Sequence, residues 1–158
     1  MNILVQNNLF RFLLPIFILL FSGCASVPET KAPSESQPAL VSYALSLQGK
    51  PYNYGKSSPE EGFDCSGFVK HVFEKEGITL PRRTKDMALY LLPIDKYNVH
   101  SGDLVFFDTN GETYSHVGIY INNDNFVHAP SQKSGKVLIS NLKERYWQQH
   151  FTGARRPK

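Results

Sequence analysis

Apolar residues in the first half of the chain recur every three to four positions, the spacing of one face of a helix. Residues 39–47 follow this pattern and stop before Gly49, a residue that suits a helix C-terminus. Residues 65–76 follow it again, between Asp64, a favourable N-cap, and Gly77. The apolar stripe of this second segment consists of Phe68, Val69, Val72 and Phe73. Two amphipathic helices are therefore predicted.

The segment between these helices, residues 50–62, is predicted to be a loop because glycine and proline interrupt it repeatedly. A third and shorter helix is expected from Thr84 to Leu91, since Pro93 prevents it from continuing. The pattern thus predicts three helices before residue 92.

Beyond residue 100 the pattern changes to the short apolar runs that are typical of strands. Four strands are expected, over residues 103–107, 116–121, 125–128 and 137–140. Residues 122–125 supply a turn between the second and third strands. Asn141 is a candidate N-cap for a last short helix through Trp147, and residues 151–155 suit a closing strand. Helices followed by strands indicate an α+β fold, with the helices packed on one side of an antiparallel sheet.

The N-terminus carries a ten-residue apolar run, residues 12–21, preceded by Arg11. The run is much shorter than the ~20 residues that a spanning helix needs, and it fits the hydrophobic part of a signal peptide. The residues that follow, Ser22-Gly23-Cys24-Ala25 after Phe21, resemble a bacterial lipobox. The alternative is an ordinary secretory cleavage site with an incidental cysteine.

A lipid-modified Cys24 would be the mature N-terminus and would anchor the protein stably, because each buried methylene adds ~0.8 kcal/mol. Ala25 after it favours the periplasmic face of the outer membrane in a two-membrane bacterium. Residues 26–38 are rich in Pro, Ser, Glu and Lys and are predicted to form an extended tether. The expected organisation is a signal peptide over residues 1–23, a lipidated cysteine and tether over 24–38, and one domain over 39–158.

Composition and charge restrict the partners of this domain. Apolar residues make up 41% of the chain and aromatic residues 13%, which is typical of a globular protein. Without residues 1–23, 16 basic residues stand against 14 acidic ones, a net charge of +2. Nucleic-acid binding needs a concentrated basic face, so this class of partner is not expected.

Cys65 remains as the second cysteine of the chain once Cys24 is assigned to the anchor. An unpaired thiol in an exported protein forms no structural disulfide, which favours a chemical use for it. Its expected place at the first turn of a helix lowers the thiol pKa and favours the nucleophilic thiolate. Cys65 is therefore a candidate nucleophile that needs a base.

Two of the five histidines are candidates for that base and for the group that orients it. The other three are expected to be solvated surface groups: His71, His100 and His150. His116 and His128 lie on predicted strands that otherwise face a core, and either alone could be a core-edge histidine satisfied by backbone groups. Together with a thiol at a helix start, they favour a catalytic reading. Gly118, on the face of His116, is expected to leave room for a partner or substrate.

The geometry of the two histidines depends on the turn between their strands. A hairpin centred on Asn122 would place His116 directly opposite His128. The turn residues centre nearer Asn123 and Asp124, so a tight turn there would offset the pair, and direct alignment needs a longer loop or a bulge.

Six stretches, taken in order, make the chain resemble a known family. They are residues 49–55, 63–69, 80–84, 101–107, 116–120 and 126–129. The chain resembles the NlpC-type murein endopeptidases, papain-like cysteine peptidases of bacterial cell walls, over nearly all of residues 40–156. Lys56 departs from the pattern, because a second glycine is common after the position of Gly55, and this concerns the shape of that loop.

The resemblance implies a papain-like fold and assigns roles to four residues. Cys65 would be the nucleophile, His116 the general base, His128 the polar group that orients the base, and Tyr52 a contact to the oxyanion. For Tyr52, a loop aromatic packed on the domain is an equal alternative. The chemistry would be acyl transfer through Cys65, and no metal or other cofactor is implied.

Three charged residues near this set have other expected roles. Asp64 would raise the pKa of the Cys65 thiol if its carboxylate pointed inward, but as an N-cap it is expected to be structural. Arg82 and Arg83 either pair with carboxylates of a wall peptide or lie on a solvated surface.

The sequence thus predicts a lipid-anchored, monomeric endopeptidase that cleaves amide bonds in the peptide part of peptidoglycan. The protein would be attached to the membrane through the lipid on Cys24. The bond would lie within a stem or at a crosslink, and the sequence does not distinguish these. One alternative is an amidase or acyltransferase on the same fold, and another is a non-catalytic wall-binding module.

Overall fold

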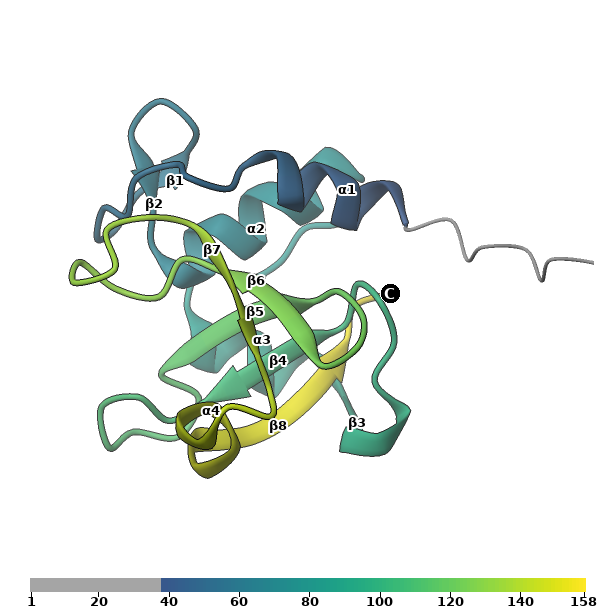
Figure 1. The fold of residues 1–158 in the computed structure, drawn as a ribbon. Coiled ribbons are helices and arrows are strands. Elements are labelled where there is room, and N and C mark those ends of the chain that lie inside the picture. The colour runs from purple at the N-terminus through teal and green to yellow at the C-terminus, as the bar shows by residue number, and fades with distance from the viewer. Residues whose placement is uncertain (1–37) are drawn as a thin grey trace, which may run out of the picture. The chain divides into compact units, whose positions relative to one another are not determined.

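The computed structural model of the protein describes residues 38–158 (Figure 1). The predictions for the signal peptide, Cys24 and the tether before Pro38 lie outside these residues. Within residues 38–158, no helix has both the length and the apolar character needed to cross a membrane.

Six strands form one antiparallel sheet in the order β3-β8-β4-β5-β6-β7. Their bounds are β3 (Leu92–Ile94), β4 (Leu104–Phe107), β5 (His116–Tyr120), β6 (Asn125–His128), β7 (Leu138–Asn141) and β8 (Phe151–Arg156). The helices are α1 (Ala39–Ser46), α2 (Cys65–Lys75), α3 (Thr84–Tyr90) and α4 (Arg145–His150), with a 3₁₀ turn at Lys96–Asn98. A small ribbon pairs β1 (Ser57–Ser58) with β2 (Gly62–Phe63). The predicted α+β class is confirmed.

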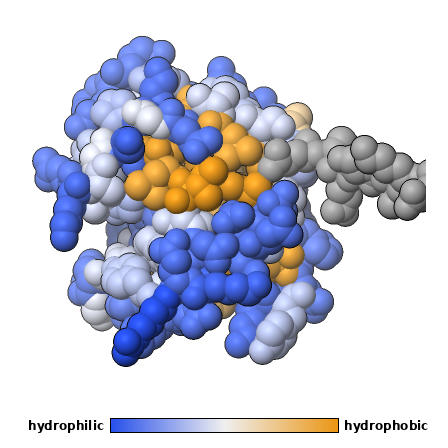
Figure 2. Space-filling model, in the orientation of Figure 1, coloured by the Kyte–Doolittle hydropathy of each residue, from blue (hydrophilic) through white to orange (hydrophobic). Residues whose placement is uncertain are grey.

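Apolar side chains cover both faces of the sheet. One face packs against α1, α2 and α3 through a core that includes Phe68, Val72, Phe106, Val117 and Val127. The other face packs against α4 through Val105, Phe107, Phe126, Trp147 and Ala154. Figure 1 shows α1 and α2 on one side of the sheet and α4 on the other, so the predicted one-sided arrangement is incomplete. In the same view, Figure 2 shows an apolar area between α1 and the β6–β7 region, surrounded by hydrophilic residues.

The last helix starts later than predicted. Asn141 ends β7 and does not cap α4, whose N-cap residue is Glu144. The Asn141 side-chain oxygen instead accepts the N–H of Lys143 at 2.8 Å, which forms a local turn between the strand and the helix.

Strands β1, β2 and β3 and the 3₁₀ turn were not predicted, and a proline or glycine lies in or beside each of these strands. The β1–β2 ribbon falls inside the loop expected over residues 50–62. Strand β3 contains Pro93, which has no N–H for a ladder, but β3 is the terminal strand of the sheet and pairs with β8 alone. An edge strand tolerates a proline, and Pro93 made residues 92–94 look unlike a strand in the sequence.

Candidate active site

Cys65 is the first residue of α2, as predicted, and its position is fixed by the residue before it. Asp64 Oδ1 accepts the N–H of Gly67 at 2.7 Å, and Asp64 Oδ2 accepts the N–H of Gly55 at 2.8 Å. The cap therefore holds both the helix start and the preceding loop. The Cys65 Sγ atom lies 3.6 Å from Thr84 Oγ1, the first residue of α3.

Arg82 neutralises the Asp64 carboxylate through a forked contact. Its Nη1 atom donates to Oδ1 at 2.9 Å and its Nη2 atom donates to Oδ2 at 2.7 Å. Asp64 is thus structural, as expected. Arg82 thus has an internal partner that neither alternative named, and contact of Arg82 or Arg83 with a wall peptide stays a prediction. Arg83 is largely exposed and lies 3.6 Å from Asp86.

The environment of Cys65 acts on its thiol in two directions. Burial raises the pKa of the Cys65 thiol, and the negative charge of Asp64 raises it further. The hydroxyl of Thr84 and the backbone N–H groups of Ser66 and Val117 lower the pKa by hydrogen bonding, but by less. The lowering expected from the helix start is therefore outweighed, and the resting thiol is protonated at neutral pH.

His116 and His128 form a direct hydrogen bond between their rings. His116 Nε2 lies 2.7 Å from His128 Nδ1, and both side chains are buried. The two residues are not opposite each other. Tyr120 pairs with Phe126, and this register places His128 beside Gly118, two residues from His116. The pair therefore meets along a diagonal of the sheet, a distance that aromatic side chains span.

The turn and one glycine make this diagonal contact possible. Asn123 and Asp124 adopt left-handed conformations, with φ of 49° and 63°, so the hairpin is centred where the turn residues predict it. A Cβ atom on Gly118 would lie 2.7 Å from Phe126 Cδ2 and 3.1 Å from His128 Cβ. Gly118 therefore makes room for Phe126 and His128, so the space expected there for a partner or substrate is taken by the partner of His116.

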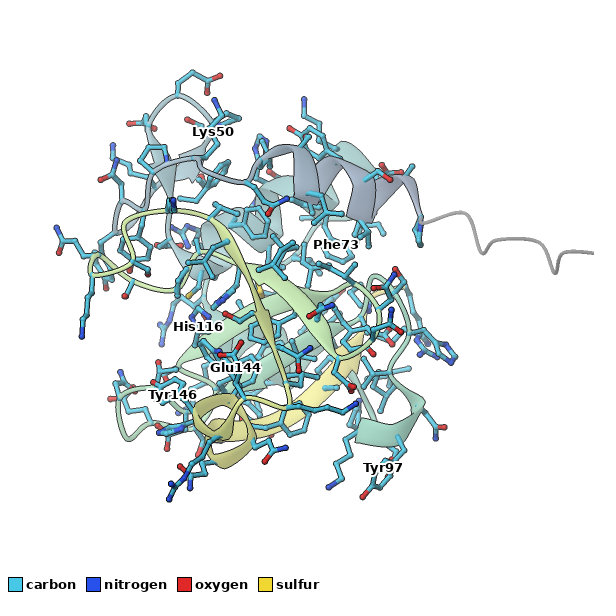
Figure 3. The ribbon with its side chains drawn as sticks, in the orientation of Figure 1. Lys50, Phe73, Tyr97, His116, Glu144 and Tyr146 are labelled. Atoms are coloured by element: carbon cyan, nitrogen blue, oxygen red, sulfur yellow. The ribbon has the colours of Figure 1, made fainter. Side chains whose placement is uncertain are left out.

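Trp147 covers the histidine pair from α4. Its ring stacks on His116 with centroids 5.7 Å apart and meets the ring of His128 edge-on at 4.9 Å. Phe107 and Phe126 complete this aromatic enclosure. Figure 3 shows His116 between the helix layer of α2 and the segment that carries Glu144 and Tyr146. Sequence reasoning did not assign Trp147 a role, although it is the one tryptophan of the chain.

The enclosure keeps both imidazoles neutral at neutral pH. Burial lowers the pKa of His116 from 6.5 to about 4. Burial also lowers the pKa of His128 well below its ordinary value, and the positive charge of a protonated His116 lowers it further. In the neutral pair, a single ring hydrogen forms the bond between the two residues.

Cys65, His116 and Tyr52 line one cleft of about 640 Å³. Residues from the surrounding loops complete its wall, including Tyr54, Arg83, Lys85, Glu112, Tyr114 and Pro130. Burial raises the pKa of the Tyr52 hydroxyl, and negative charge on Cys65 raises it further, because the two groups lie close together. A thiol, an imidazole and a phenol thus converge on one space. The role of Tyr52 toward an oxyanion stays a prediction.

The remaining histidines lie outside the walls of this cleft. His100 is exposed, as expected. His71 is half-buried, its Nε2 atom lies 2.8 Å from the hydroxyl of Tyr43, and burial lowers its pKa. His150 is also half-buried and its Nδ1–H donates to the carbonyl of Tyr146 at 2.7 Å. His71 and His150 are therefore partly exposed surface residues that each have an internal partner, rather than fully solvated groups.

Comparison with known proteins identifies relatives of the whole described domain. Residues 49–156 match the model of the NlpC/P60 family. The probable endopeptidase NlpC of Escherichia coli is 40% identical over 152 residues, which cover 91% of this chain and 97% of that protein. Murein DD-endopeptidase MepH of E. coli is 44% identical over 114 residues, 68% of this chain and 41% of MepH. The bifunctional muramidase/DL-endopeptidase CwlT of Bacillus subtilis is 38% identical over 135 residues, 84% of this chain. The chain thus spans only about two fifths of the length of MepH and CwlT.

Solved structures show the same fold. An NlpC/P60 family protein from Bacillus cereus superposes with a TM-score of 0.70 at 32% identity, over 77% of this chain and 41% of that protein. The NlpC/P60 domain of the peptidoglycan hydrolase SagA gives a TM-score of 0.64 at 28% identity, over 75% of this chain and 96% of that domain. The predicted resemblance and the papain-like fold are confirmed, and the chain belongs to the NlpC/P60 family.

Proposed function

We propose that this protein is a lipid-anchored endopeptidase that hydrolyses amide bonds in the peptide part of peptidoglycan. Family membership makes it a cysteine-type peptidase, so the proposal concerns its substrate, its site residues and its anchor. The observation that carries it is the cleft that Cys65 and His116 both line, with His128 hydrogen-bonded to His116.

The arrangement supports a general-base mechanism. The Nε2 atom of His116 is occupied by His128, so Nδ1 is the atom available to accept the proton of the Cys65 thiol. The sulfur attacks the amide carbonyl carbon, and the oxyanion is held by backbone N–H groups at the start of α2 and by the hydroxyl of Tyr52. The proton on His116 Nδ1 then passes to the leaving amine as the carbon–nitrogen bond breaks. Water hydrolyses the thioester and regenerates the thiol.

The protonation states support transfer of the proton during the attack. Burial holds the pKa of the thiol above its usual value and the pKa of His116 at about 4. A thiolate–imidazolium pair is therefore not the resting state. Removing the thiol proton as the sulfur attacks lets the developing charge appear on the oxyanion, where the cleft provides hydrogen-bond donors.

The names of the relatives support a peptidoglycan substrate and suggest two bonds. One relative is a murein DD-endopeptidase and another carries a DL-endopeptidase activity. A DD bond lies at a crosslink, whereas a DL bond lies within a stem. Both candidates share the amide chemistry, and the fragments released from the wall distinguish them.

Digestion of purified peptidoglycan tests the proposal. Wild-type protein should release peptide fragments whose masses identify the bond, and Cys65→Ala should release none. Folded wild-type protein that releases no fragment but binds the wall would support the wall-binding alternative and sink the hydrolase proposal. Release of intact stems from the glycan, or transfer of an acyl group to an added amine, would favour the amidase or acyltransferase alternative.

The anchor is proposed on sequence alone and needs its own experiment. Residues 1–23 would be removed, Cys24 would carry the lipid, and residues 24–38 would link it to the domain on the periplasmic face of the outer membrane. Radioactive palmitate should label the wild-type protein and not Cys24→Ser, which should leave the membrane fraction. Unchanged labelling in the variant would exclude Cys24 as the site. Light scattering of the soluble domain tests the proposed monomer.

A further inference from the structure

The hydrogen bonds of the histidine pair continue to a third residue. His128 is fully buried, and both of its ring nitrogens have partners. Nδ1 lies 2.7 Å from His116 Nε2, and Nε2 lies 2.9 Å from the hydroxyl oxygen of Ser140 on β7. Ser140 is itself half-buried. The pair is therefore the inner part of a chain that runs from the cleft to the edge of the sheet.

The sheet places these three residues on one face of three neighbouring strands. Ser140 pairs with Phe126, so it lies on the face of β6 that carries His128, displaced by two residues. His116 is displaced from His128 by the same step on the other side. The diagonal contacts of His128 with His116 and with Ser140 follow from this register, because residues two apart on a strand point to the same face.

Hydrogen-bond chains of neutral imidazoles have two directions. In one direction, His116 Nε2–H donates to His128 Nδ1, and His128 Nε2–H donates to Ser140. His116 Nδ1 is then unprotonated and can accept the thiol proton. In the other direction, Ser140 donates to His128 Nε2, and His128 Nδ1–H donates to His116 Nε2. The hydrogen of His116 then sits on Nδ1, the ring nitrogen outside the bond to His128, and His116 cannot act as the base.

We propose that Ser140 is a positioning residue that accepts a hydrogen bond from His128 Nε2–H and thereby keeps His116 Nδ1 free to act as the base. This inference rests on the proposed function, since it concerns how that mechanism's base is prepared. Ser140 touches no reacting atom. No proton moves through it during catalysis, because His116 gives and takes protons at Nδ1 while its Nε2–H stays with His128.

The burial of His128 makes this acceptor necessary. Without the hydroxyl, the Nε2–H of a fully buried ring has lost its acceptor, and an unpaired buried donor is unfavourable. Moving that hydrogen to Nδ1 removes the unpaired donor and reverses the direction of the chain. Because Ser140 is half-buried, its own hydrogen can reach solvent while its oxygen accepts from His128.

Two nearly isosteric substitutions distinguish the effect of the hydroxyl from the effect of side-chain size. Ser140→Thr keeps the hydroxyl, Ser140→Val removes it, and both add similar bulk on a strand that favours branched residues. Ser131→Ala, in the loop before β7, removes a serine hydroxyl that bonds Ser134 and is the matched control. Melting curves establish that each variant is folded at the assay temperature.

The test combines ring-nitrogen NMR of ¹⁵N-histidine-labelled protein with peptidoglycan-fragment kinetics. In wild type, Ser140→Thr and Ser131→Ala, both His116 and His128 should carry their hydrogen on Nε2. In Ser140→Val, both hydrogens should move to Nδ1, and kcat should fall at least ten-fold while KM stays within about two-fold, since a positioned base contributes about 10²–10⁴.

The two readouts separate failure of this inference from failure of the proposed function. Wild-type nitrogen shifts in Ser140→Val, with or without a loss of activity, would overturn the role of Ser140. A wild-type protein that cleaves no wall peptide would overturn the proposed function, and NMR would still report which tautomer Ser140 sets.

Discussion

Next to Cys65, the side chains of Asp64 and Arg82 each make specific hydrogen bonds. Asp64 caps α2 and binds the loop before it, and Arg82 neutralises the carboxylate from α3's side. Without Arg82, the negative charge next to the thiol would disfavour the thiolate still further. Arg82 therefore acts on the nucleophile through Asp64, although it lies in the wall of the cleft.

Arg82→Ala should destabilise the protein, and Arg83→Ala should not. The first change breaks a forked contact to a buried carboxylate and should lower the unfolding free energy by about 1–2 kcal/mol, a figure reduced for the 38% exposure of the arginine side chain. Arg83 is 77% exposed, and its loss should change stability by less than about 0.5 kcal/mol. Urea unfolding of both variants measures the difference. Equal stabilities would contradict the structural role of Arg82.

The Cys65 thiol should become reactive at a higher pH than the thiol of an ordinary cysteine. Burial raises its pKa, so thiolate forms only as pH passes the usual value of about 8.5. Alkylation by iodoacetamide should accelerate through pH 9 in the native protein, with urea-unfolded protein as the reference. A plateau reached by pH 7 would show a stable thiolate–imidazolium pair and contradict the protonated resting state.

Among the elements, the β5–β6 hairpin determines whether the histidines can meet. Its turn sets the register, and Gly118 leaves the space into which Phe126 and His128 pack. The hairpin therefore specifies the hydrogen bond between His116 and His128 before any side chain of α2 contributes.

Gly118→Ala should damage the site more than the fold. The added methyl would lie 2.7 Å from a buried ring and 3.1 Å from His128 Cβ, so one of them must move. Overpacking of this kind costs about 1–3 kcal/mol. Thermal melts should show a lower but cooperative transition, and kcat should fall at least ten-fold at temperatures where the variant is folded. Ile139→Ala, at an exposed position of β7, serves as the control. Unaltered kcat in Gly118→Ala would contradict the packing argument.

Periodicity predicted the elements that bury a regular apolar face. Helices α1, α2 and α3 and strands β4 to β8 all appear within one or two residues of their expected bounds. It could not predict β3, because Pro93 masks an edge strand, or the displacement of the histidines, because register depends on the turn. Cys65, His116 and Tyr52 were expected together and share a cleft. Ser140, Thr84 and Trp147 were missed because their contacts join residues far apart in sequence.

At the scale of the whole molecule, the buried imidazoles connect stability to pH. His116 has a pKa of about 4 in the folded protein and an ordinary value of 6.5. Between these values the unfolded chain binds the proton more strongly, so protonation favours unfolding as pH falls. The folded state is therefore most affected between pH 6.5 and 4.

Acidification from pH 6.5 to 4 should lower the unfolding free energy by up to about 3 kcal/mol through His116 alone, from ~2.5 pKa units at 1.36 kcal/mol each. The His116→Gln variant lacks this titration, so its stability should depend less on pH over the same interval. Urea midpoints at several pH values measure both profiles. Parallel profiles would contradict burial of a neutral His116.

The position of strand β8 in the sheet bears on the order in which the sheet can form during folding. The hairpins from β4 to β7 join neighbouring segments, whereas β8 inserts between β3 and β4 from a position more than 40 residues after β4. Contacts between distant segments form late because they close long loops. The histidine pair and Ser140 lie on the hairpin strands β5 to β7 and can thus assemble early. Strand β3 joins the sheet only through β8. A partly folded molecule would then contain the histidine pair before strand β8 completes the sheet.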